Sequence, residues 1–143
     1  MSERDGEDYF ALTITLTRDV ERIRREARSL AADIGFARAE AEAVALAVSE
    51  LGTNLVRYAP GGEIRVMTCW RDAGKGIVIQ SRDSGAGIAD VDLALQDGYS
   101  TGGGLGSGLP AVQRLMDEFA LSTGPDGTHI EVRKWLNRLS RLP

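Results

Sequence analysis

A carboxylate and an amide, Glu50 and Asn54, lie four residues apart in a stretch whose apolar residues recur at helical spacing. Residues at this separation share one face of a helix, so both side chains are expected to point the same way. Glu50 could then accept a proton from an attacking hydroxyl or water. The side-chain oxygen of Asn54 could hold Mg²⁺, which takes oxygen ligands and keeps water and phosphate oxygens in its shell. The alternative interpretation is a surface glutamate followed by a helix-interior asparagine.

A second candidate group follows a buried-looking strand, in residues 83–88 (DSGAGI). The carboxylate of Asp83 could accept a hydrogen bond from the exocyclic amine of adenine, whereas guanine presents an oxygen at that position. Gly85 and Gly87 permit tight backbone turns against a flat base. Thr128, at the start of the last predicted strand, could add a hydroxyl to the same adenine edge. The alternative is an ordinary glycine-containing loop after a strand.

The third candidate is the glycine-rich segment 102–108, in which five of seven residues are glycine. Pro110 fits only near the start of a helix, so this segment is expected to open one. Free backbone N–H groups and the helix dipole favour a phosphate there. The spacing of Gly104, Gly106 and Gly108 is neither a Walker motif nor a strict Rossmann fingerprint. The alternative is a flexible loop.

No Lys or Arg lies between Asp92 and Gly108. The charge of a bound phosphate would therefore be met by Mg²⁺, by backbone amides and by a residue from elsewhere, such as Arg114. The sequence leaves the group that stabilises the terminal phosphate unassigned.

Apolar periodicity and turn residues predict the elements that position these groups. The order is β-α-α-β-β-α-α-β-β, with Thr17 as the cap of the first helix and Gly35 after its end. Strand hairpins rather than repeated βαβ units indicate an α+β fold, a two-layer sandwich with helices on one face of a mixed, mostly antiparallel sheet. The expected strands are residues 9–16, 63–71, 77–82, 119–122 and 128–135, and the expected helices are 17–34, 37–58, 91–95 and 109–119.

The chain of 143 residues is long enough for one domain with a core. We expect a flexible N-terminus at residues 1–8, one domain at 9–136 and a short basic tail at 137–143. A net charge of −4 argues against nucleic acid or an anionic membrane as a partner. No apolar run of membrane-spanning length and no signal peptide is evident, which favours a cytoplasmic protein. One Cys and one His exclude a disulfide framework and disfavour a zinc site.

Together, these motifs resemble those of the Bergerat-fold (GHKL) ATPases over residues 9–136. The segment from Glu50 to Asn54, followed by Tyr58 and Ala59, resembles the N box of that superfamily, and residues 83–87 and 104–109 resemble its two glycine boxes. The resemblance implies Glu50 as general base and Asn54 as Mg²⁺ ligand. The ATP-binding residues that it implies are Asn54, Asp83, Gly85, Gly87, Ile88, Gly104, Gly106, Ser107, Gly108, Leu109 and Thr128.

Within that superfamily the chain is similar to the anti-sigma-factor-type serine/threonine kinases, and most of all to the switch kinases of the stressosome. The segments DGYSTGGGLGSGLPAVQRLMDEF and GTHIEVRKW carry this similarity. It implies that ATP and Mg²⁺ are cofactors and that a Ser or Thr of a STAS-domain protein is phosphorylated. It further implies that the kinase then binds and activates a PP2C-type phosphatase.

Two other functions fit the same motifs. One is a nucleotide-gated protein-binding switch, in which ATP selects a partner with little catalysis. The other is a bare ATPase, which the absence of further domains makes less suitable for coupling hydrolysis to motion. The identity of the phosphorylated residue, the triggering signal, the nucleotide affinity and the oligomeric state stay open at this point.

Overall fold

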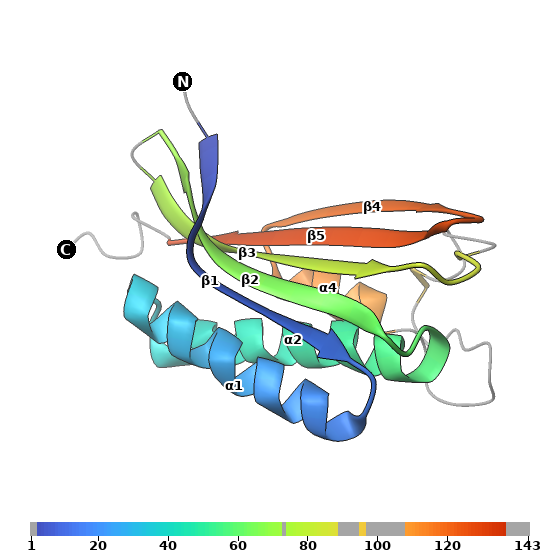
Figure 1. Cartoon of the computed structure of the whole chain (residues 1–143). Helices are drawn as coiled ribbons and strands as arrows, with labels where there is room; N and C mark the ends of the chain where they lie inside the picture. Colours follow the sequence, from blue (N-terminus) through green and yellow to red (C-terminus); the bar gives the residue numbers. More distant parts are fainter. Residues whose placement is uncertain (1–2, 73, 89–94, 97–107, 137–143) are drawn as a thin grey trace.

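The computed structural model describes residues 3–72, 74–88, 95–96 and 108–136 (Figure 1). Five strands and three helices are defined within this part of the chain. In chain order they are β1 (Glu3–Ile14), α1 (Thr17–Ile34), α2 (Arg38–Tyr58), β2 (Gly62–Arg71), β3 (Gly74–Asp83), α4 (Leu109–Leu115), β4 (Glu118–Gly124) and β5 (Gly127–Trp135).

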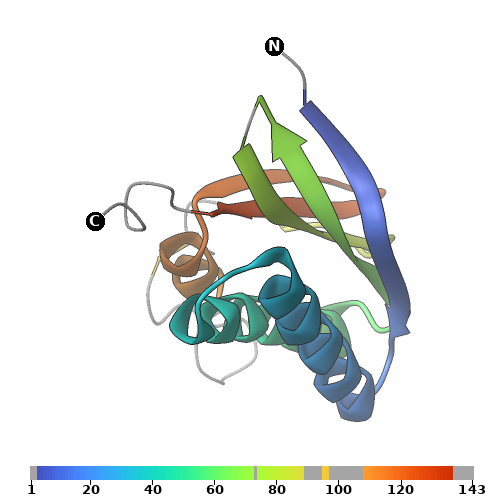
Figure 2. The same cartoon turned by 90° about the vertical axis from the view of Figure 1, so that its left-hand side faces the viewer.

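The strands form one sheet in the order β1-β2-β3-β5-β4. Every neighbouring pair is antiparallel, so the sheet of the described strands is antiparallel rather than mixed. Figures 1 and 2 show the helices packed on one face of this sheet, which confirms the predicted α+β sandwich. Because β5 lies between β3 and β4, its first residues come beside the end of β3, and Asp83 is paired with Thr128.

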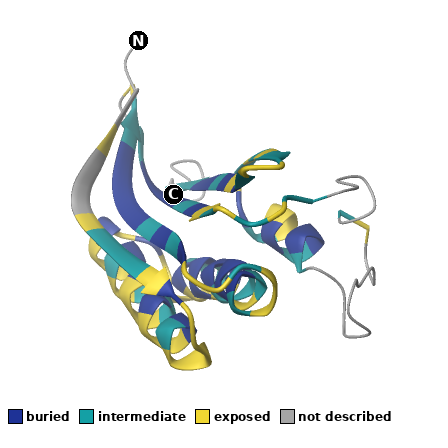
Figure 3. Cartoon of the chain, turned by 45° about the vertical axis from the view of Figure 1, so that its right-hand side comes forward, coloured by how far each residue is buried: buried dark blue, intermediate teal, exposed yellow. Residues whose placement is uncertain are grey.

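The core lies between the helices and the facing side of the sheet (Figure 3). Its fully buried members include Ile23 of α1, Leu51 of α2 and the strand residues Ile64, Ile79 and Val132. Alternate residues along each strand point to this side, as strand geometry requires. No helix in the described part of the chain is both long enough and apolar enough to cross a membrane.

The first helix begins and ends where the sequence indicates, but its cap differs. Leu16 rather than Thr17 occupies the position before the first helical residue, and a leucine side chain cannot accept a hydrogen bond. The carboxylate of Asp19 in the first turn reaches back instead, and accepts the N–H groups of the two residues before the helix, Thr15 at 3.0 Å and Leu16 at 2.8 Å. At the other end Gly35 has a φ of 120°, which only glycine adopts readily.

The helix predicted over residues 109–119 is too long. It ends at Leu115, Met116 is extended, and β4 begins at Glu118. The apolar positions that suggested a helix face also suit a strand, because Phe119 and Leu121 point into the core from β4. Pairing with β5 therefore overrides the local helical pattern. Of the helix expected at 91–95, only residue 95 lies within the described residues.

Strand β1 begins six residues before the expected Tyr9, so residues 3–8, predicted to be flexible, belong to the sheet. A buried ion pair accounts for this extension. Both guanidinium NH groups of Arg133 in β5 donate to the carboxylate of Asp5 at 2.9 Å, and the Arg133 side chain is only 7% exposed. A charge this deeply buried requires partners, and the start of β1 supplies one in addition to Glu131 of β5, which lies 3.2 Å away.

Candidate active site

Helix α2 carries Glu50 and Asn54 on one face, both partly exposed. Their neighbours Leu51 and Leu55 are buried in the core and fix the rotation of the helix. The carboxylate of Glu50 lies against Gly108, the residue that opens α4, because a Cβ at that position would overlap Glu50 Oε2. Gly108 also has a φ of 77°, a conformation that favours glycine. The structure therefore brings the predicted base directly against the last glycine of the second glycine-rich segment.

Asp83 ends β3 and begins the first glycine-containing loop. Its Oδ1 accepts the backbone N–H of Gly85 at 2.8 Å, which folds the loop back over the carboxylate. A carboxylate can accept several hydrogen bonds. Within the described part of the chain the other oxygen, Oδ2, has no partner, so it is available to a donor such as an exocyclic amine.

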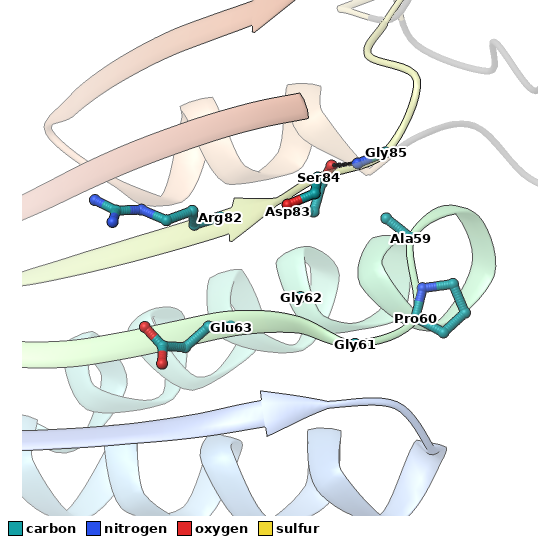
Figure 4. A pocket seen from close by; sticks show the side chains of 9 residues that line it. All are labelled: Ala59, Pro60, Gly61, Gly62, Glu63, Arg82, Asp83, Ser84 and Gly85. Carbon is teal, nitrogen blue, oxygen red and sulfur yellow. Dashed lines mark hydrogen bonds between the residues drawn. The ribbon is translucent and has the colours of Figure 1, made fainter. Parts of the chain in front are cut away.

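An open pocket of about 420 Å³ adjoins Asp83 (Figure 4). It lies between the end of α2, the start of β2 and the end of β3, where a Cβ on Gly85 would lie 3.4 Å from that of Ala59. A volume of this size is ordinary for a small-molecule site. The lining residues are Ala59, Pro60, Gly61, Gly62, Glu63, Arg82, Asp83, Ser84 and Gly85.

Thr123, which the sequence interpretation overlooked, holds the end of the glycine-containing loop that follows Asp83. Its hydroxyl accepts the N–H of Ile88 at 2.8 Å and lies 2.7 Å from the hydroxyl of Thr128. Gly87, the residue before Ile88, has a φ of 86°, and a Cβ there would overlap the carbonyl oxygen of Gly124. Thr128 is 7% exposed, and its hydroxyl keeps capacity for a second hydrogen bond. A threonine before a turn carries no sequence signal that would identify this role.

Comparison with known proteins places the whole arrangement in a family. Residues 13–134 match the model of the histidine kinase-like ATPase domain. The chain belongs to the histidine kinase-like ATPase family. This confirms the resemblance to the GHKL ATPases and implies that the domain binds ATP.

This ATPase domain is 39% identical over 130 residues to the serine/threonine-protein kinase RsbT of Bacillus subtilis (strain 168). The match covers 90% of this chain and 98% of that protein. Among solved structures, the histidine kinase domain of the Erythrobacter litoralis EL346 blue-light activated histidine kinase has a TM-score of 0.52 at 20% identity. That match covers 84% of this chain and 60% of the other, and it bears on the fold alone.

The remaining predicted site residues of the ATPase domain fall into three groups. Leu109 is 1% exposed and packs in the core, and its part in ATP binding stays a prediction. Ile88 is half-buried and packs against the same core. Gly104, Gly106 and Ser107 lie outside the described residues.

The donor chemistry of the domain fits a magnesium ion held jointly with phosphate. Within the described residues no three His, Cys, Asp or Glu side chains cluster into a metal site. Asn54 offers a single amide oxygen, one turn of α2 from Glu50. An ion with one protein ligand suits Mg²⁺, which usually completes its shell with water and substrate phosphates.

Proposed function

We propose that this protein is an ATP-dependent serine/threonine kinase that phosphorylates a STAS-domain protein in a bacterial stress-signalling partner switch. Its class, serine/threonine-protein kinase, is that of the RsbT relative, which aligns over nearly the whole of both chains. The single observation that carries the proposal is the position of Glu50, whose carboxylate lies against Gly108 and shares a helix face with Asn54. A base beside the start of a helix is suited to a hydroxyl that attacks a bound phosphate.

Each residue has a defined part in the proposed transfer. Asp83 and Thr128 hold the adenine edge, and Asn54 contributes an oxygen ligand to Mg²⁺. When bound, the ion neutralises phosphate charge as the transition state forms. Glu50 takes the proton of the acceptor hydroxyl, whose oxygen bonds to the γ-phosphorus as the bond to ADP breaks. Positioning and electrostatics dominate such transfers, and a general base adds about 10²–10⁴-fold.

The second half of the proposal is a binding function. After transfer the kinase leaves its STAS-domain substrate, then binds and activates a PP2C-type phosphatase in the cytoplasm. This step requires no chemistry at Glu50, so it is separable from catalysis. If a transfer-dead variant still activates the phosphatase, the nucleotide-gated binding switch is a function in its own right.

The test compares Glu50→Gln with Glu42→Gln, a control on the same helix whose side chain pairs with Arg28 at 2.9 Å. Transfer of labelled phosphate from ATP to a purified STAS-domain protein is measured beside calorimetric binding of Mg-ATP. We expect Glu50→Gln to lower transfer about 10²–10⁴-fold with little change in nucleotide affinity, while the control behaves as wild type. Wild-type transfer by Glu50→Gln would remove Glu50 as the base. Failure of the wild type to phosphorylate any STAS-domain protein would overturn the proposed substrate.

A further inference from the structure

Arg82 and His129 lie side by side on the face of the sheet opposite the helices. They are directly across from each other in the pairing of β3 with β5. Strand residues alternate between the two faces, so Asp83 and Thr128 turn toward the helices while Arg82 and His129 turn away from them. Figures 1 and 2 show the helices on one side of the sheet only, and Figure 4 shows the Arg82 side chain extending away from Asp83. The pair is therefore open to solvent, on the reverse of the proposed adenine edge.

Neither side chain of this pair has a polar partner within the described residues, and both are exposed. Side chains directly opposite each other in a sheet are about 4.5–5.5 Å apart at Cβ. When the imidazole of His129 is protonated, it and Arg82 form two adjacent cations. Like charges placed in this way repel each other, and an anion between them removes the repulsion.

Two carboxylates share this face of the sheet, and both are already paired. Glu131 accepts a hydrogen bond from the side-chain amide of Gln80 at 2.8 Å and another from Arg133 at 3.2 Å. Glu63 of β2 is paired with Arg65 on the same strand. Neither carboxylate is therefore free to balance the two cations.

Arg82 and His129 also line an open pocket of about 250 Å³ between β3, β5 and β4. The exposed residues on its β4 side, Ala120 and Ser122, are small and uncharged, which leaves the space above the pair open. The volume is below the range of about 300–1,000 Å³ that is usual for a whole small-molecule ligand. Its size therefore fits a single side chain.

We propose that this pocket binds a glutamate or aspartate side chain of a partner protein. The guanidinium of Arg82 can donate two parallel hydrogen bonds to a carboxylate, and protonated His129 adds a charged donor from the next strand. The net charge of −4 disfavours a polyanion such as nucleic acid, whereas one carboxylate needs only this local pair. Because the pocket and the proposed adenine edge lie on opposite faces of the same strands, the partner and the nucleotide do not compete.

The probe for this site is the peptide acetyl-Ala-Glu-Ala-amide, with acetyl-Ala-Gln-Ala-amide as its uncharged match. The sequence contains one histidine, so a single imidazole NMR signal reports on the pocket. The full chain is titrated at constant ionic strength, with and without saturating Mg-ATP, and inorganic phosphate is titrated in parallel. Arg82→Gln removes one of the two cations, and Arg25→Gln, a change at an exposed arginine of α1, is the matched control.

We expect the glutamate peptide to shift the imidazole signal saturably and the glutamine peptide to leave it unchanged. Arg82→Gln should weaken binding about threefold, the effect of losing an exposed ion pair, while Arg25→Gln binds as the wild type does. The affinity should also fall as the pH is raised from about 5 to about 8, because the imidazole loses its charge over this range.

Three results would overturn the proposal. Equal responses to the two peptides, or wild-type affinity in Arg82→Gln, would show that the pair does not bind a carboxylate. Displacement of the glutamate peptide by Mg-ATP would place the peptide in the nucleotide site. Tighter binding of phosphate than of the peptide would replace the acidic side chain by a phosphorylated group as the occupant.

Discussion

The carboxylate of Glu50 occupies the space that a side chain at residue 108 would fill. The absence of a Cβ at Gly108 thus has two separate consequences. It permits the positive φ that turns the chain into α4, and it leaves room for the proposed base. A substitution there should affect stability and chemistry by different mechanisms.

Gly108→Ala is expected to lose about 1 kcal/mol of stability from the positive φ. It should also lose most phosphate transfer, because the methyl group displaces the flexible end of Glu50. Gly35→Ala is the matched control, since Gly35 has a φ of 120° and follows α1, outside the pocket lining. Thermal unfolding and transfer rates separate the two effects. Equal transfer by both variants would mean that contact with Gly108 does not position Glu50.

The hydroxyl of Thr123 links the backbone N–H of Ile88 to the hydroxyl of Thr128, two residues of the proposed adenine site. Thr123→Val keeps the shape but leaves that N–H without its acceptor. We expect a stability loss of about 1 kcal/mol, the low end of the cost of an unsatisfied donor because this N–H is only partly buried, and weaker binding of Mg-ATP. Ser122→Ala, an exposed hydroxyl on the neighbouring residue, should change neither quantity. Denaturant unfolding and calorimetry measure the two effects, and identical behaviour of both variants would exclude the bridging role.

At the scale of elements, three strands are tied together on the side of the sheet away from the helices. Glu118 of β4 accepts a hydrogen bond from Arg71 of β2 at 3.0 Å and from the indole N–H of Trp135 in β5 at 2.8 Å. The Arg71 guanidinium also lies 4.7 Å from the centroid of the Trp135 ring. Hydrogen bonding from Arg71 holds the pKa of the Glu118 carboxyl below its ordinary value.

This pKa shift predicts a pH dependence of stability. A carboxyl whose pKa is lowered in the folded state stabilises the protein above its unfolded pKa, and this stability disappears as the pH falls through the folded pKa. Glu118→Gln should therefore reduce stability at neutral pH and flatten the loss of stability below about pH 4.5. The effect should be about 1 kcal/mol or less, because the Glu118 side chain is 40% exposed.

Denaturant unfolding across the acid range measures this dependence. Glu21→Gln is a suitable control, because Glu21 is exposed on α1 and forms no ion pair with any described residue. If Glu118→Gln and wild type lose stability in parallel on acidification, the cluster does not contribute through ionisation of Glu118.

The elements that the sequence predicts well are those whose packing agrees with their local pattern. Helices α1 and α2 and the β2–β3 hairpin follow apolar spacing and glycine-containing turns, and they are confirmed within a few residues. The errors arise where a distant partner decides. Phe119 belongs to β4 because it pairs with Val132, and residues 3–8 join the sheet where Asp5 meets Arg133. Neither partner is visible in a local window of sequence.

The candidate site divides in the same way. Residue type and spacing were enough to propose Glu50, Asn54 and Asp83. Glu50 and Asn54 share one helix, and Asp83 ends one strand, so no contact between elements had to be known. The sequence does not reveal that Glu50 abuts Gly108, since this contact depends on how α4 packs on α2. It does not reveal Thr123 either, because a bridging hydroxyl is defined only by its partners.

At the scale of the whole molecule, the proposed nucleotide joins α2 to β3, so binding should stabilise the entire domain. Mg-ATP at 100 times its Kd is expected to add about 2.7 kcal/mol, or about 5–10 °C in Tm for a domain of this size. Asp83→Asn should abolish this shift. Its side-chain oxygen can still accept the N–H of Gly85, but its NH₂ group cannot accept from adenine.

Thermal unfolding with and without Mg-ATP measures this effect. Asp33→Asn, the same change at an exposed residue of α1 outside the pocket lining, serves as the control and should retain the shift. A full shift in Asp83→Asn would place the adenine elsewhere.

The position of β5 inside the sheet determines when Asp83 and Thr128 can come together during synthesis. Ribosomes deliver the chain from its N-terminal side, so this strand emerges after the other described elements, yet it must insert between β3 and β4. Until it does, Asp83 has no Thr128 opposite it and the two outer parts of the sheet are not joined. A chain that lacks β5 therefore has no Thr128 beside Asp83, so the proposed stabilisation by Mg-ATP begins only once β5 has been inserted.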